Sequence, residues 1–495
     1  MADSKRSRLS RRSFVRSLAY AAAGGALAGC AGNQPTEQAQ AQTPRPTAGK
    51  RPPNVLIIFP DQWRRQALGC YGDPVVRTPN LDRLAAEGVR FERCYTNNPV
   101  CSPARATIMT SRYPHQTGMI HNNLLLRPEE VTIAECLRDA GYATEYIGKW
   151  HLDGQAKPGF VRPGERRQGF ESFEGFNRGH WYHNPQYFTN EGKLIKPEGF
   201  ESFYQTDLAI NFMKKHKDQP FFVYLAWGPP HMPYRPPEEF DRFTAADLKW
   251  RPNVPQKFRS DKRTIQNLCG YYGLCEALDH EVGRLLKFLD ESGLAQNTLV
   301  LFTADHGDMH GSHGLRYKTH PEEESAGIPL IARLPGVIPN GLVSKTLISL
   351  IDIMPTVLSL CGLPVPKTAV GRDLSAAFKG KSVNDEPLYL EGRMQVFKES
   401  NKPGQFGHGG YGAWRAIVTP QHKLAVDFTG KVRLLVDLEK DPYELNNLAD
   451  KPEAAALQKE LLAQLKEIGK RTGDPFPEPV PPTLSTDAQG NIIST

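Results

Sequence analysis

The residues with the clearest chemical potential lie in one short stretch, Cys101-Ser102-Pro103-Ala104-Arg105, which an apolar and hydroxyl-bearing run follows. The stretch combines a nucleophile, a rigid proline and a permanent positive charge, and the run after it predicts a helix. Free N–H groups at a helix N-terminus stabilise anions, so the pattern favours an anionic substrate. A single cysteine is also a common small core residue, and the stretch alone leaves both roles open.

Polar side chains follow four predicted buried strands, at the point where each strand ends. These strands are the apolar runs over residues 54–59, 143–147, 220–227 and 297–303. Continuous apolar runs are typical of parallel strands covered on both faces, and α/β sheets bind ligands beyond the carboxyl ends of their strands. The polar residues that follow are Asp61, Gln62, Lys149, His151, His231, Asp305 and His306. We expect them to share one site, although Asp61 could equally cap a helix and Lys149 and His151 could lie in exposed loops.

Helices must connect these strands, and the spacing of apolar residues predicts where they lie. Helical periodicity covers residues 78–88, 131–137, 206–215, 268–292 and 351–360, and a further strand covers residues 328–333. Strands that alternate with helices are typical of an α/β fold. A smaller C-terminal antiparallel sheet with one helix is predicted from short runs at 387–390, 413–418, 423–427 and 433–438 and a helical pattern at 454–468.

Two segments without a periodic pattern carry side chains suited to a substrate. Residues 152–205 form a long insertion rich in basic and aromatic residues, and such insertions often build the wall of a binding site. We expect His180, Trp181 and His183 to contact the substrate. A second loop, over residues 311–317, is rich in Gly and His and leads to Lys318.

Length and charge indicate a multidomain globular protein. A chain of 495 residues exceeds the size at which one core usually keeps growing. Its net charge of +7 is concentrated in residues 1–50, where eight basic residues face two acids, so the remainder carries +1 and we predict no nucleic-acid partner. We expect an export signal over 1–30, a flexible linker over 31–53, a catalytic α/β domain over 54–385, a C-terminal subdomain over 386–470 and a tail over 471–495.

The N-terminus has the features of a bacterial export signal. A twin-arginine pair, Arg11-Arg12, precedes a short apolar stretch over residues 18–27. The sequence Leu27-Ala28-Gly29-Cys30 resembles a lipobox, which implies cleavage before Cys30 and lipid attachment to it; a plain small-residue cleavage site is the alternative. We expect export by the twin-arginine (Tat) machinery, to the periplasm or to the membrane surface as an anchored lipoprotein.

Taken together, these features resemble a formylglycine-dependent sulfatase of the alkaline phosphatase superfamily, over residues 54 to about 450. The pentapeptide that begins at Cys101 matches the family core C-x-P-x-R, whose cysteine is oxidised to formylglycine. Supporting matches occur at Asp61 and at residues 113–118, 148–151, 303–307 and 437–448. The resemblance implies an alkaline phosphatase-like α/β fold, in which helices sandwich a large mixed, mostly parallel sheet.

The resemblance also implies how the substrate would be attacked. One hydroxyl of the hydrated aldehyde at Cys101 would attack sulfur, and the second would later expel sulfate and regenerate the aldehyde. Arg105 would hold this diol. Lys149 and Lys318 match lysines that neutralise the sulfate oxygens as charge builds in the transition state.

Three further residues match the family's proton-transfer and positioning groups. His151 fits the base that deprotonates the second hydroxyl, and His231 fits the acid that protonates the leaving alcohol. Asn122 aligns with an amide that touches the nucleophile in some members of the superfamily.

By the same resemblance, a divalent cation would be bound by Asp61, Gln62, Asp305, His306 and the modified Cys101. Many sulfatases have Asp-Asp where this chain has Asp61-Gln62, and Asp-Asn where it has Asp305-His306. Oxygen ligands favour Ca²⁺, while an imidazole also suits Mn²⁺ or Zn²⁺. We expect Ca²⁺, with Mn²⁺ or another divalent cation as alternatives.

The expected function is hydrolysis of sulfate esters of carbohydrates by an exported enzyme, after a formylglycine-generating enzyme has oxidised Cys101. The Asp-Gln and Asp-His pairs also resemble formylglycine-dependent phosphonate monoester and phosphodiester hydrolases, which are the first alternative. A non-catalytic glycan-binding lipoprotein is the second alternative, and the complete set of catalytic residue types argues against it.

Overall fold

The computed structural model describes residues 51–392 and 412–493. The predicted export signal, with Arg11, Arg12 and Cys30, and nearly all of the predicted linker lie outside these residues. Within the described ranges, no helix is both long and apolar enough to cross a lipid bilayer.

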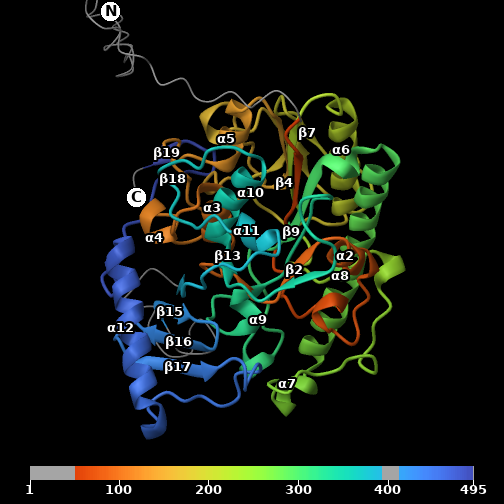
Figure 1. The fold of residues 1–495 in the computed structure, drawn as a ribbon. Coiled ribbons are helices and arrows are strands. Elements are labelled where there is room, and N and C mark those ends of the chain that lie inside the picture. Colours follow the sequence, from red (N-terminus) through yellow and green to blue (C-terminus); the bar gives the residue numbers. More distant parts are fainter. Residues whose placement is uncertain (1–50, 393–411, 494–495) are drawn as a thin grey trace, which may run out of the picture. The chain divides into compact units, whose positions relative to one another are not determined.

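A ten-stranded sheet forms the centre of the α/β part (Figure 1), with the strand order β12-β2-β11-β9-β1-β8-β4-β5-β6-β7. In that order the strands span Leu342–Ser344, Val89–Phe91, Leu330–Arg333, Thr298–Thr303, Asn54–Ile58, Phe221–Ala226, Ala143–Lys149, Ser172–Phe176, Tyr187–Phe188 and Leu194–Ile195. The five strands from β9 to β5 pair in parallel, and β11 is antiparallel to both of its neighbours. The predicted mixed, mostly parallel sheet is therefore confirmed.

The central strands are continuously apolar because helices cover both faces of the sheet. Every residue of β1, β8 and β9 is buried. Helices α2 and α6 pack on α8, whereas α3 and α5 pack on α10, and Figure 1 shows these two groups on opposite sides of the sheet. The helices are α2 Pro79–Ala86, α3 Cys101–Thr110, α4 Pro114–Thr117, α5 Ile133–Asp139, α6 Glu201–Lys215, α7 Gln256–Arg259, α8 Lys262–Glu291, α9 Glu323–Ala326, α10 Ile353–Leu360 and α11 Ser375–Phe378.

Local chemistry explains two differences from the predicted bounds. Helix α8 begins at Lys262 rather than at residue 268, because the Asp261 carboxylate accepts a hydrogen bond from the Thr264 N–H at 2.9 Å and caps the helix. The strand predicted over residues 328–333 is divided at Pro329, which has no N–H for a ladder. Its first part, β10 (Gly327–Ile328), joins β3 (Cys94–Tyr95) and β13 (Ile348–Ser349) in a small separate sheet, and its second part is β11.

The insertion over residues 152–205 extends the main sheet, which the sequence did not predict. Strand β5 lies parallel to β4, and β6 and β7 continue the sheet in antiparallel pairs. Strands of two residues, such as β6 and β7, are too short to produce a detectable alternating pattern.

The predicted C-terminal antiparallel sheet is confirmed. Strands β14 (Leu388–Gly392), β15 (Trp414–Val418), β16 (His422–Asp427) and β17 (Val432–Asp437) pair in chain order. Helix α12 (Ala455–Thr472) packs on β14, β15 and β16 (Figure 1). The residues after α12 were predicted to be a tail, but they return to the α/β part, where the Thr483 N–H donates to the Gly118 carbonyl at 2.9 Å. Beyond this contact, β18 (Ser485–Thr486) pairs with β19 (Ile492–Ile493).

Candidate active site

Four neighbouring parallel strands deliver predicted site residues to one edge of the sheet. The strands are β9, β1, β8 and β4, in that order. Asp305 follows β9, Asp61 follows β1, His231 follows β8, and Lys149 is the last residue of β4. The carboxyl ends of parallel strands face one way, so residues far apart in the sequence meet there.

Cys101 is the first residue of α3 and is 1% exposed. Its Sγ lies 3.0 Å from Lys318 Nζ, 3.4 Å from His306 Nε2 and 3.7 Å from Asp61 Oδ1. Burial and Asp61 raise the pKa of the thiol, but Lys149, Lys318 and His306 together hold that pKa well below its usual range. A thiolate at a helix N-terminus beside cations is the environment of a reactive cysteine rather than of a core one.

Two cations bind the carboxylates next to Cys101. Arg105 donates to Asp61 Oδ2 at 3.1 Å and to Asp305 Oδ2 at 3.2 Å, and Lys149 Nζ donates to Asp61 Oδ2 at 2.5 Å. All four side chains are buried. Burial raises the pKa of Asp61, but Lys149 and the other cations lower it well below its ordinary value, while burial and Asp61 raise the pKa of Asp305 to about 6.

Asp61, Cys101, Asp305 and His306 form a buried group of metal-ligating side chains. One ligand atom from each residue lies within 4.8 Å of the others. Carboxylates and an imidazole together suit Ca²⁺, Mn²⁺ or a similar divalent cation. The raised pKa of Asp305 reflects two adjacent buried carboxylates, a charge that a bound cation would offset. The residues therefore fit a divalent cation.

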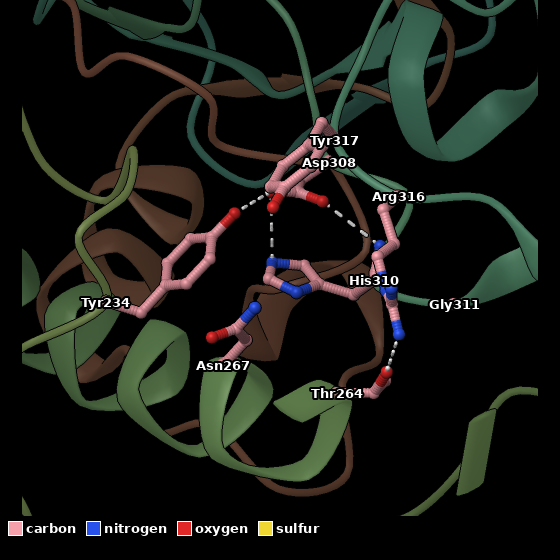
Figure 2. A pocket seen from close by; sticks show the side chains of 8 residues that line it. All are labelled: Tyr234, Thr264, Asn267, Asp308, His310, Gly311, Arg316 and Tyr317. Carbon is pink, nitrogen blue, oxygen red and sulfur yellow. Dashed lines mark hydrogen bonds and ion pairs between the residues drawn. The ribbon is translucent and has the colours of Figure 1, made fainter. Parts of the chain in front are cut away.

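Gln62 reaches the site in a backbone conformation with φ = +68°. Its Nε2 donates to Asp308 Oδ2 at 2.6 Å and lies 3.0 Å from the Tyr234 hydroxyl. Figure 2 shows Asp308 between Tyr234 and His310, at a cavity of about 10 Å³ that has room for about one water. Only the Oε1 atom of this amide is chemically suited to bind a cation.

The residues after β4 place an imidazole near Cys101. Gly148 has φ = +104°, and a Cβ at this position would lie 2.2 Å from the Ala226 carbonyl oxygen. Only glycine therefore allows β4 to pack this closely against β8. His151 has φ = +59°, and its Nε2 lies 3.2 Å from Asn123 Oδ1. Burial and Lys149 lower the pKa of His151 to about 4, so the ring is neutral at neutral pH and can accept a proton.

Two consecutive asparagines contact the same region. Asn122 Oδ1 accepts a hydrogen bond at 3.0 Å from the N–H of Ser102, the residue after Cys101, so the predicted amide lies beside the nucleophile. Asn123 was not predicted as a site residue, yet its Oδ1 contacts His151 and accepts from Arg178 at 2.7 Å. The sequence feature that could have indicated Asn123 is its position directly after Asn122.

His180 and His231 stack face to face with ring centroids 4.0 Å apart. His180 Nε2 lies 3.4 Å from Lys149 Nζ, so this predicted substrate residue joins the site. The Tyr182 hydroxyl, also missed from sequence, lies 2.9 Å from His180 Nδ1 and donates to the His231 carbonyl at 2.7 Å. Burial and Lys318 lower the pKa of His231 to about 3, and burial and His231 lower the pKa of His180.

The other two predicted substrate residues have different contacts. Trp181 packs against Phe176 and under the Lys157 ammonium group. His183 is exposed, contacts the Arg235 carbonyl at 2.9 Å and lines a groove of about 640 Å³. Among the described residues, no hydrogen bond or ring contact links either side chain to Cys101.

Two family models match the chain. Residues 53–363 match the model described as Sulfatase. Residues 311–471 match the model described as N-sulphoglucosamine sulphohydrolase, C-terminal.

Individual proteins match over most of their length. An ulvan-active sulfatase of Formosa agariphila is 36% identical over 434 residues, covering 86% of this chain and 82% of that protein. A structure described as a complex with its substrate D-glucosamine-2-N,6-O-disulfate has a TM-score of 0.76 at 25% identity and covers 86% of this chain and 99% of its own. A phosphonate monoester hydrolase of Silicibacter pomeroyi shares the fold, with a TM-score of 0.70 at 23% identity over 85% of this chain and 96% of its own.

Proposed function

The chain belongs to the sulfatase family and is a sulfuric ester hydrolase, and from this premise we propose that it cleaves sulfate esters of carbohydrates with a formylglycine hydrate made from Cys101. The contact that carries the proposal is the 3.0 Å approach of Lys318 Nζ to Cys101 Sγ, beside buried Asp61 and Asp305. In the mature protein, a hydroxyl of the hydrate stands in place of this sulfur. A cation at that position favours the ionised nucleophile.

The reaction proceeds in two bond exchanges. One hydroxyl of the hydrate loses its proton, and its oxygen forms a bond to sulfur while the bond from sulfur to the sugar oxygen breaks. The sugar oxygen gains a proton, and the sugar leaves as an alcohol. The second hydroxyl then loses its proton, its oxygen forms the aldehyde double bond, and the bond from carbon to the sulfated oxygen breaks. Sulfate leaves, and water restores the hydrate.

Three cations bind and orient the anionic groups. Lys318 lies against the nucleophile position, and Lys149 and Arg105 hold Asp61 from the opposite side of its carboxylate. Lys149 and Lys318 would neutralise the sulfate oxygens as negative charge develops on them. Arg105 would hold the hydrate in the orientation that attack requires.

Two histidines move the protons. His151 is the base for the second hydroxyl: burial and Lys149 keep its ring neutral at neutral pH, so it can accept a proton. It lies beside Ser102 and Cys101, and the Ser102 hydroxyl donates to the His151 carbonyl at 2.7 Å. His231 is the acid for the leaving alcohol. Burial and Lys318 lower the pKa of His231 to about 3 in the protein without substrate. A sulfate anion bound between His231 and Lys318 would favour the protonated ring.

The cation would be held by Asp61, Asp305, His306, the amide oxygen of Gln62 and the modified residue 101. When bound, it polarises the sulfate group and lowers the pKa of the hydrate. Ca²⁺ is the proposed ion because most of these ligands are oxygen atoms, and His306 leaves Mn²⁺ as the alternative.

Replacement of the nucleophile tests the mechanism. We expect Cys101→Ala to lower kcat/KM for a sulfate monoester by a factor on the order of 10⁴ to 10⁶. The peptide that contains residue 101, isolated from the native host, should have the mass of formylglycine. Cys136→Ala, in a half-buried cysteine on α5, is the control and should keep full activity. Unmodified cysteine throughout an active preparation would exclude the mechanism.

Cation removal tests the metal site separately. Chelation should abolish turnover and lower the thermal midpoint, and Ca²⁺ should restore both. Asp305→Asn should show no thermal response to Ca²⁺. Full activity in protein that elemental analysis finds free of divalent metal would contradict the proposed site.

The substrate class is supported by the sulfated carbohydrate ligand and the ulvan activity named for similar proteins. Phosphonate monoester or phosphodiester hydrolysis is the alternative, because Asp61-Gln62 and Asp305-His306 resemble those enzymes. Turnover of a sulfate monoester and of a phosphodiester by one preparation separates the two. A higher kcat/KM for the phosphodiester would reverse the assignment.

We also propose that the protein is exported through Arg11-Arg12 and anchored by lipid at Cys30, as the sequence predicts. Arg11→Lys with Arg12→Lys should retain the protein in the cytoplasm. Cys30→Ala should release exported protein from the membrane fraction. A membrane-bound Cys30→Ala protein would contradict the anchor.

A further inference from the structure

Lys318 stands on a strained turn. Its two neighbours, Tyr317 and Thr319, both adopt left-handed conformations, with φ of +65° and +80°. Neither is a glycine, so each conformation costs free energy and persists where the surroundings hold it in place. The position of the Lys318 ammonium group therefore depends on the contacts of this turn.

The turn is held from two sides. The Thr319 N–H donates to the carbonyl of Pro99, two residues before Cys101, at 3.2 Å. The Thr319 carbonyl accepts a hydrogen bond at 2.9 Å from the indole Nε1 of Trp414 in the C-terminal sheet. The turn thus joins the nucleophile segment to a sheet that contributes no side chain to the Cys101 contacts described above.

Trp414 is itself rigidly placed. It is the first residue of β15, is 0% exposed and packs in one apolar cluster with Tyr95 and Ala326. It pairs with Gly392 on β14, where a Cβ would lie 2.3 Å from the indole ring. A glycine at residue 392 therefore leaves the space that the indole fills.

We propose that Trp414 is a positioning residue for Lys318: its indole N–H fixes the strained turn and so holds the Lys318 ammonium group against the nucleophile. The inference rests on the proposed role of Lys318 in sulfate binding. It assigns the C-terminal sheet a part in substrate binding, in addition to its structural role.

Trp414→Phe tests the role because it removes the N–H donor and keeps an aromatic ring. We expect kcat/KM for a sulfate monoester to fall about 10- to 100-fold and inhibition by inorganic sulfate to weaken by at least threefold. Tyr389→Phe is the matched control, since it removes a buried hydroxyl that donates to Asp474 at 2.7 Å from the same sheet. It should lower the thermal midpoint without changing sulfate inhibition.

A double-mutant cycle separates positioning from general destabilisation. If Trp414 acts through Lys318, Trp414→Phe should have no effect on kcat/KM in a Lys318→Ala background. An equal loss in both backgrounds would overturn the inference. Full activity of Lys318→Ala would refute the proposed function of Lys318, whereas loss in Lys318→Ala with full activity in Trp414→Phe would overturn the role of Trp414 alone.

Hydrogen exchange of the unaltered protein gives a second test that needs no folded variant. The amide of Thr319, which donates to the Pro99 carbonyl, should be protected as strongly as those of β15, because the hydrogen bond from Trp414 holds the turn to that strand. Rapid exchange of the turn while β15 stays protected would overturn the inference.

Discussion

At the scale of single residues, Gln62 has a more specific environment than its sequence position indicated. The sequence presented it as a neutral replacement for a second metal-binding aspartate. In the structure its Nε2 is a donor to buried Asp308. An aspartate at residue 62 would place a carboxylate beside the buried carboxylate of Asp308. The glutamine instead supplies a hydrogen-bond donor to that carboxylate.

Gln62→Asp should therefore destabilise the protein. Losing the donor and adding a like charge should lower the free energy of unfolding by about 1 to 3 kcal/mol, measured in urea with chelator present. Asp308→Asn in the same chain restores a donor and should recover part of the loss. Equal stability of the single and double variants would contradict the pairing of Gln62 with Asp308.

Residue types in motifs could be predicted, whereas residues that act through their contacts could not. Cys101, Lys149 and Lys318 stand in short recognisable stretches, and the structure brings them together. Tyr182 and Asn123 were missed because their importance lies in what their oxygen atoms reach, His180, His231 and His151. Sequence spacing carries no information on such contacts.

At the scale of elements, the end of β4 combines backbone geometry with site chemistry. Gly148→Ala introduces both a left-handed alanine and a close approach to the Ala226 carbonyl. We expect a loss of about 2 to 4 kcal/mol in unfolding free energy and a clear loss of activity, because Lys149 is the next residue.

Gly141→Ala is the control for this variant, since Gly141 has φ = +88° but nothing within 4 Å of an added Cβ. It should cost about 1 kcal/mol and leave kcat/KM unchanged. If the two variants lose equal stability, the close approach at Gly148 has no energetic consequence.

The long elements could be predicted because their patterns are local. The buried β1, β8 and β9 and the C-terminal strands lie close to their predicted ranges, since continuous or alternating apolar runs identify strands directly. The extension of the sheet by β5, β6 and β7 could not be predicted, because pairing partners decide such short strands. The return of residues 483–486 to Gly118 is likewise a long-range contact.

At the scale of the whole molecule, buried ion pairs join separate segments. Glu324 on α9 is 0% exposed and accepts hydrogen bonds from Arg251 at 2.8 Å and Asn253 at 2.9 Å. Asn253 also donates to the Tyr443 carbonyl at 3.1 Å, so the group links three distant parts of the chain. Burial raises the pKa of Glu324, but Arg251 and His313 lower it to about 2.

The lowered pKa of Glu324 makes the free energy of unfolding depend on pH. Because the folded pKa lies below the unfolded value of 4.5, the stabilisation is complete above about pH 4.5 and is lost as pH falls towards 2. Between pH 6 and pH 3, the unfolding free energy should fall by about 2 kcal/mol more in the unaltered protein than in Glu324→Gln.

Urea titrations at each pH measure the difference. Glu129→Gln, at an exposed position, is the control and should follow the unaltered protein. Parallel curves for Glu324→Gln and the unaltered protein would show that Glu324 does not carry the acid dependence.

The burial of Cys101 sets an order of events in biosynthesis. At 1% exposure the thiol is out of reach of another enzyme once the fold has formed, and parts of that fold come from the far end of the chain, including Trp414 and Thr483. At about 5–20 residues per second, the ribosome needs roughly 15 to 75 seconds to reach them after it has made residue 101. During that interval Cys101 would be accessible to an oxidising enzyme. A codon change that shortened the interval would lower the fraction of the protein in which Cys101 is oxidised.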